Sequence, residues 1–81
     1  MHEGDFEIEG RTFYYEVLHI ETTDGEDYSG ADMDAHIREA DRVFYSAEAE
    51  DGERFYRWLG GPFEDFSEVE NAIADEAEEY A

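Results

Sequence analysis

Three residues with metal-binding side chains occupy alternate positions in the middle of the chain. Asp32, Asp34 and His36 stand at positions i, i+2 and i+4, so they share one face if this segment is a strand. Carboxylates together with an imidazole ring can ligate a divalent cation. The same pattern is typical of a solvated strand face, and we favour that interpretation. We therefore expect no metal site and no cofactor.

Residues for other catalytic chemistry are sparse. Ser29, Ser46 and Ser67 lie in no recognisable nucleophile motif, and no glycine pattern makes a phosphate-binding loop. The chain has no Cys, which excludes disulfides and thiolate metal sites. An 81-residue chain also leaves little room for a substrate cleft. We expect a protein that is not an enzyme.

The balance of charge is the strongest signal in the sequence. The chain carries 25 acidic residues and 5 basic ones, all of them Arg, so its formal net charge is -20. This charge excludes a basic surface for direct binding of nucleic acid. No apolar run approaches the roughly 18 residues of a membrane span, and the first residues lack the features of a signal peptide. We expect an intracellular, cytoplasmic protein with no membrane contact.

The elements that position these residues form a single α+β domain over residues 1–81. Aromatic residues at regular positions favour a folded domain over a disordered acidic tail. We expect a four-stranded antiparallel β-meander followed by two α-helices packed on one face. The strands expected from hydrophobic alternation cover residues 5–9, 12–23, 31–38 and 43–50, with a hairpin turn at Asp24-Gly25.

Residues 31–38 allow a second interpretation. Ala31, Met33, Ala35 and Ile37 alternate with polar residues, which favours a strand. A helix with Met33 and Ile37 on one face, continuing to Ala40 and Phe44, is the alternative.

The second half of the chain is expected to be helical. Asp51 can cap a first helix whose apolar face holds Phe55, Trp58 and Leu59, and Gly60-Gly61-Pro62 would end it. This helix would bury Trp58. A capping box at Ser67 and Glu70 predicts a second helix over residues 68–80.

Acidic pairs on the strands are the candidate binding residues. Two strand residues at i and i+2 lie about 6.7 Å apart on one face, a spacing that resembles successive phosphates of a nucleic-acid strand. The pairs, expected on the sheet face that the helices leave open, are Glu7/Glu9, Asp32/Asp34 and Glu48/Glu50.

The long second strand carries apolar residues on both of its faces, and only one face can meet the helices. The other presents Tyr14, Leu18 and Ile20 beside Glu16, an apolar strip with acids around it. Such a strip often marks a protein interface. A β-bulge, or a homodimer that covers the strip, is the alternative.

Two explanations fit the large excess of acidic residues. An acidic protein can occupy the basic groove of a nucleic-acid-binding protein in place of DNA. Proteins adapted to high salt also carry many acids and little Lys, and this chain has no Lys. In that case the chain is a salt-adapted, halophilic protein-interaction domain of unknown partner.

A resemblance favours the first explanation. Trp58-Leu59-Gly60-Gly61-Pro62 followed by Val69-Glu70-Asn71-Ala72-Ile73 resembles small phage-encoded anti-CRISPR proteins, most closely an inhibitor of the type I-F surveillance complex. The resemblance implies an inhibitor that acts in the cytoplasm of the host bacterial cell, binds a CRISPR effector subunit and blocks target DNA. Its functional residues are not carried over. We therefore expect an anti-CRISPR DNA mimic.

Overall fold

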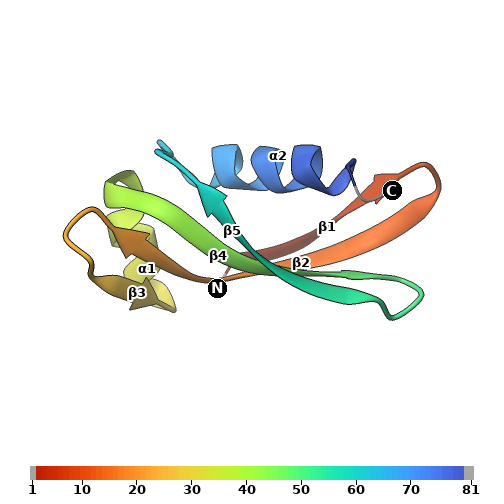
Figure 1. Cartoon of the computed structure of the whole chain (residues 1–81), viewed down its shortest axis with the longest axis horizontal. Helices are drawn as coiled ribbons and strands as arrows, with labels where there is room; N and C mark the ends of the chain where they lie inside the picture. The colour runs from red at the N-terminus through yellow and green to blue at the C-terminus, as the bar shows by residue number, and fades with distance from the viewer. Residues whose placement is uncertain (1, 80–81) are drawn as a thin grey trace.

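The computed structural model describes residues 2–79, which form an α+β fold around one antiparallel sheet (Figure 1). The sheet has five strands rather than the expected four, in the order β1-β2-β4-β5, with β3 also paired to β2. The elements in chain order are β1 (His2–Ile8), β2 (Arg11–Thr22), β3 (Asp27–Ser29), α1 (Ala31–His36), the short 3-10 helix η1 (Ile37–Glu39), β4 (Ala40–Ala49), β5 (Arg54–Gly60) and α2 (Phe66–Ala77).

The β1–β2 hairpin follows the alternation that the sequence predicts. Exposed acids on β1 alternate with half-buried residues such as Phe6 and Ile8 that face the core. Glu9 and Gly10 form the turn with φ of 49° and 81°, and hairpin turns of two residues require positive φ at both positions.

A β-bulge at Leu18 changes which side of β2 faces the core. Val17 pairs with Tyr45, but His19 pairs with Phe44, so β2 has one extra residue at this point. Odd-numbered residues face the core before the bulge, and even-numbered residues do so after it. Ile20 is therefore fully buried, at 0% exposure, so the predicted apolar strip of Tyr14, Leu18 and Ile20 is wrong and the alternative, a β-bulge, is confirmed.

Residues 31–38 are mainly helical, so the favoured strand is wrong. Met33 and Ile37 lie four residues apart, as α1 leads into η1, and both are buried in the core. A strand would place Ala31 and Ala35 inward with them, but both alanines are exposed. The helical alternative explains the burial of Met33 and Ile37 because residues at i and i+4 share a helix face. It does not continue to Ala40 and Phe44, which belong to β4.

The expected first helix is instead strand β5, which forms a hairpin with β4. Residues 50–53 make the turn, where Gly52 has φ of 94° and the Ala49 amide donates to the Glu53 carbonyl at 2.8 Å. Leu59 faces the core, whereas Trp58 is 38% exposed on the opposite side of the sheet. Cross-strand pairing with β4 decides the structure of this short apolar segment.

Helix α2 confirms the second predicted helix in its existence and approximate range. Its N-cap is Asp65 rather than Ser67: the Asp65 carboxylate accepts from the Glu68 amide at 3.1 Å. Glu68 reaches back to accept from the Glu64 amide at 2.8 Å. The predicted C-terminal residue, Tyr80, lies outside the described residues.

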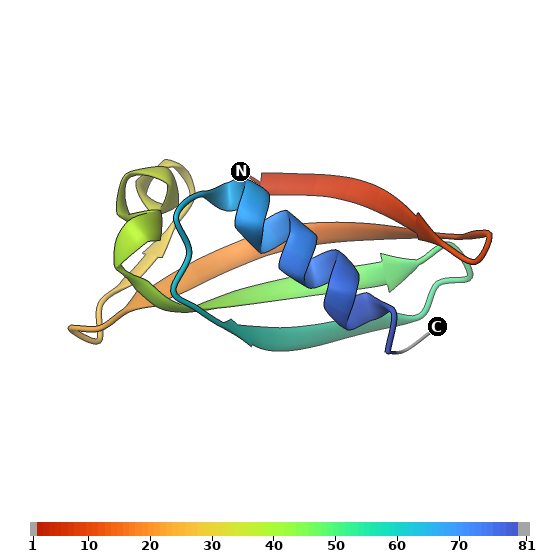
Figure 2. The ribbon, with the colours of Figure 1, turned by 90° about the horizontal axis from the view of Figure 1, so that it is seen from above.

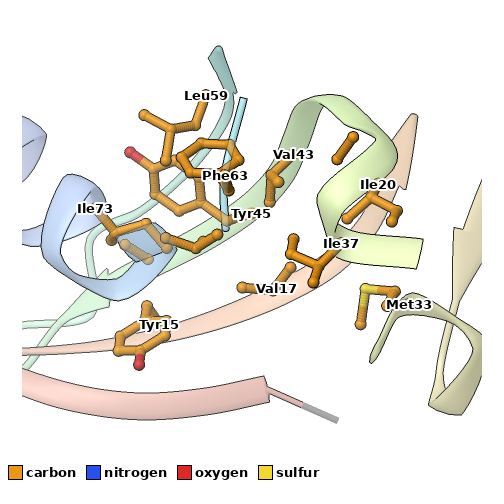
Figure 3. Packing of buried hydrophobic residues seen from close by; sticks show 13 residues of the cluster. Tyr15, Val17, Ile20, Met33, Ile37, Val43, Tyr45, Leu59, Phe63 and Ile73 are labelled. Atoms are coloured by element: carbon orange, nitrogen blue, oxygen red, sulfur yellow. The ribbon is translucent and has the colours of Figure 1, made fainter. Parts of the chain in front are cut away.

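Figure 2 shows α2 lying diagonally across one face of the sheet. Its buried residues Val69, Ile73 and Ala77 face the strands. The core beneath the helix is drawn in Figure 3, where Val17, Tyr45 and Ile73 meet between the sheet and α2. Met33 and Ile37 extend this core toward the end of the sheet near Ile20.

Candidate functional site

The face of the sheet opposite α2, which we call the open face, gathers the residues with the clearest potential for binding. Strand alternation and the pairing register assign residues to it. It comprises Glu3, Asp5, Glu7, Thr12, Tyr14, Glu16, His19, Glu21, Arg42, Phe44, Ser46, Glu48, Arg54, Tyr56 and Trp58.

One half of the open face is acidic. Glu3, Asp5 and Glu7 project from β1 and are exposed, and Glu3 lies directly opposite Glu16 of β2. Like charges at directly opposed positions destabilise a sheet. Within residues 2–79, no basic group forms an ion pair with any of these four carboxylates. The acidic half therefore holds negative charge that the fold does not use.

The other half of the open face is an aromatic cluster of His19, Phe44, Tyr56 and Trp58. The Phe44 ring centroid lies 5.0 Å from that of Trp58 and 6.1 Å from that of Tyr56. His19 packs edge-on against Phe44 and Trp58 at 5.2 and 5.3 Å. Tyr56 is 55% exposed, so the cluster offers apolar surface to a partner.

Two arginines are held by this face of the sheet. Arg42 donates two hydrogen bonds to the Glu21 carboxylate, at 3.0 and 3.2 Å, and its guanidinium lies 3.8 Å from the Trp58 ring centroid. Arg54 donates to Glu48 at 2.8 Å, and this hydrogen bond raises the pKa of Arg54. On the open face, therefore, each of these two guanidinium groups is bound by a carboxylate. That of Arg42 also stacks on the Trp58 ring.

A shallow hollow of about 160 Å³ lies between the two halves. Its lining includes the carboxylates of Glu3, Glu16 and Glu48, with Tyr14, Ser46 and Arg54 beside them. Ser46 lies between Phe44 and Glu48 on this face of β4. Its side chain is small, so it leaves space for the hollow.

Only part of the predicted binding set meets on the open face. Glu7, Tyr14, Glu16 and Glu48 lie there. Glu9 and Glu50 are exposed in the two turns at one end of the sheet, next to β1 and β4. The remaining predicted residues, which are separated from this face or only border it, are Asp32, Asp34, Leu18 and Ile20.

Asp32 and Asp34 belong to α1, so the predicted third row of acids on the sheet does not exist. Asp34 instead pairs with His2, whose ring stacks on Phe66 at 3.5 Å. Leu18 is half-buried at the bulge.

Glu3, Asp5 and the aromatic cluster are not among the binding residues predicted from the sequence. Asp5 lies in the expected strand 5–9 on the same face as Glu7, and the alternation that continues back to His2 could have added Glu3. Nothing in the sequence alone brings Phe44 beside Trp58, since their contact depends on the β4–β5 pairing.

Metal-ligating side chains do not converge in the described part of the chain. Residues 2–79 contain no group of three or more His, Asp or Glu side chains placed to hold a metal ion. His36 pairs with Glu39 at 2.5 Å and stacks on Tyr28 at 3.8 Å. Over the same residues, no helix is long and apolar enough to cross a membrane.

No family model, curated protein or solved structure matches the chain.

Proposed function

We propose that this chain is a binding protein that uses its open face to bind a basic protein partner. One observation carries the proposal: carboxylates that form no ion pair within residues 2–79 lie next to an exposed aromatic cluster, on the face of the sheet opposite α2. Acids attract basic side chains over long range, and aromatic rings with arginines form the well-packed centre of many interfaces.

The partner that we propose is a nucleic-acid-binding protein, and the chain competes with nucleic acid for it. Glu3, Asp5 and Glu7 follow one another along β1 at about 6.7 Å, comparable to the phosphates of one strand. A groove that attracts phosphates also attracts these carboxylates. The specific partner to test first is a CRISPR effector complex, and this choice rests on the resemblance to anti-CRISPR proteins.

A competition experiment tests this function. A fluorescently labelled target DNA is bound to a type I-F surveillance complex, and the chain is titrated into the preformed complex while anisotropy reports DNA release. We expect the DNA to be released, with weaker inhibition as salt is added, because screening weakens interactions between exposed charges. A ternary complex that keeps its full DNA affinity would contradict competition.

A second candidate is a salt-adapted interaction domain, and the distribution of the acids favours it. Exposed acids also cover regions remote from the open face, including the β2–β3 turn, α1 and the last turns of α2. A mimic of one stretch of DNA does not need acids on every side.

Folding at low salt separates the two candidates, because self-repulsion at net charge -20 is screened by salt. Circular dichroism at low and at high salt is the measurement. A folded chain at low salt favours the DNA mimic, and loss of structure there favours salt adaptation.

A further inference from the structure

The hollow on the open face lies where two rows of cross-strand neighbours run side by side. One row runs Glu3, Glu16, Ser46 and Tyr56 across four strands. The adjacent row runs Asp5, Tyr14, Glu48 and Arg54. The hollow is therefore fixed by the sheet itself rather than by loops.

Ser46 is a buried polar residue that lines this hollow. It is only 6% exposed, and no side chain or backbone group of residues 2–79 forms a hydrogen bond with its hydroxyl. The Ser46 hydroxyl is not among the side-chain atoms of residues 2–79 that are sealed from solvent without a partner, so it opens on the hollow and can bond with a group placed there.

The charges around the hollow indicate the sign of that group. Glu3, Glu16 and Glu48 contribute three negative charges, and Arg54 compensates one of them through its bond to Glu48. Two negative charges remain, on residues that face each other directly across β1 and β2. A cation between them would remove a repulsion that the free protein tolerates.

We propose that the hollow binds the guanidinium group of an arginine from the basic partner, an inference that rests on the proposed function. A guanidinium presents several N–H donors in one plane, which matches the carboxylates of Glu3 and Glu16 and the hydroxyl of Ser46. Its flat face can stack on Tyr14, which is 52% exposed. The chain's own Arg42 is held in this way between Glu21 and Trp58 on the same face.

Peptide binding tests the inference. The probes are a nine-residue arginine peptide and a lysine peptide of equal length and charge, titrated by calorimetry at moderate salt. We expect the arginine peptide to bind the wild-type protein more tightly than the lysine peptide. Glu16→Gln should weaken arginine-peptide binding about tenfold, as expected for losing a charged hydrogen bond, whereas Asp75→Asn on α2 should change it less than about twofold.

Two further measurements keep the test independent of folding. Glu16→Gln should raise the melting temperature, because it removes the repulsion with Glu3, so weaker binding cannot be attributed to unfolding. Ser46→Val fills the hollow and should reduce the preference for arginine over lysine. Equal loss in Glu16→Gln and Asp75→Asn, or equal binding of the two peptides to the wild-type protein, would overturn the inference.

The same variants separate this inference from the proposed function. If the wild-type chain releases DNA but shows no arginine preference at the hollow, the arginine site is wrong and the proposed function stands. If the wild-type chain prefers the arginine peptide at the hollow but releases no DNA, competition with nucleic acid is wrong and the arginine site stands.

Discussion

Trp58 shows how the role of one residue changes with its element. On the expected helix it would be buried, and its loss would unfold the chain. On β5 it lies on the open face, 38% exposed, with the Arg42 guanidinium over its ring. Its contribution to stability therefore comes from partial burial and a cation–π contact rather than from filling the core.

We expect Trp58→Ala to leave the protein folded and to lower the free energy of unfolding by about 1–2 kcal/mol. The matched core variant is Ile73→Ala, which should cost about 2–5 kcal/mol because Ile73 is fully buried. Urea denaturation measures both. A cost for Trp58→Ala that equals or exceeds that of Ile73→Ala would place the indole in the core.

Tyr15 links the core to pH. Burial raises the pKa of its hydroxyl above 10.0, and a hydrogen bond with Glu70 and the charges of Glu70 and Asp5 raise it further. Above pH 10 the unfolded chain releases this proton while the folded chain keeps it. Proton loss then favours the unfolded state, so this group lowers stability as the pH rises beyond 10.

The variant Tyr15→Phe removes that titration. We expect it to be less stable than the wild type near neutral pH, because the bond with Glu70 is lost. It should also lose less stability than the wild type between pH 9 and pH 11, because the pKa of an ordinary tyrosine is roughly 10. Thermal melts across this range are the measurement, with Tyr14→Phe on the open face as the control. An unchanged alkaline slope in Tyr15→Phe would show that another group causes it.

At the scale of elements, local patterns identified the structure wherever one period dominated. The strict alternation of β1 and the three- and four-residue spacing of Val69, Ala72, Ile73 and Ala77 each fit one element, and both were predicted. Phe55, Trp58 and Leu59 fit a helix as well as a strand, since the run is short. Its pairing with β4 decided the outcome, and pairing is a long-range interaction.

The candidate site was less predictable than the fold because it depends on register. The bulge at Leu18 reverses the faces of β2, so Ile20 moves into the core and His19 joins the aromatic cluster. A one-residue change in register moves every later side chain to the other face. The apolar residues on both faces of this strand left a bulge open as an alternative, but no residue in the sequence fixes its position.

The N-terminus of α2 provides a test at this scale. Asp65→Ala removes the side chain that accepts from the Glu68 amide and should cost about 1 kcal/mol of stability. Ser67→Ala should change stability by less than about 0.5 kcal/mol, because Asp65 and not Ser67 is the N-cap. Denaturation midpoints of the two variants give the comparison. A larger loss for Ser67→Ala would restore the cap predicted from the sequence.

Across the whole molecule, the two faces of the sheet have different roles: one holds the hydrophobic core and the other holds exposed charge. The face under α2 contains the core, and the open face carries acids that the fold does not neutralise together with an aromatic cluster. Net charge -20 opposes compaction, so a face that keeps repelling carboxylates side by side is better suited to a partner than to folding. We therefore propose that the open face, rather than the total charge, determines binding.

Two variants that each lose three exposed carboxylates distinguish the open face from the total charge in the DNA-release assay. Glu3→Gln/Asp5→Asn/Glu7→Gln removes them from the open face, and Asp75→Asn/Glu78→Gln/Glu79→Gln removes them from the end of α2 and the turn after it. We expect the open-face variant to fail to release DNA, while the α2 variant releases it as the wild type does. Equal inhibition by both variants would contradict this proposal, because the charge would then act without a specific face.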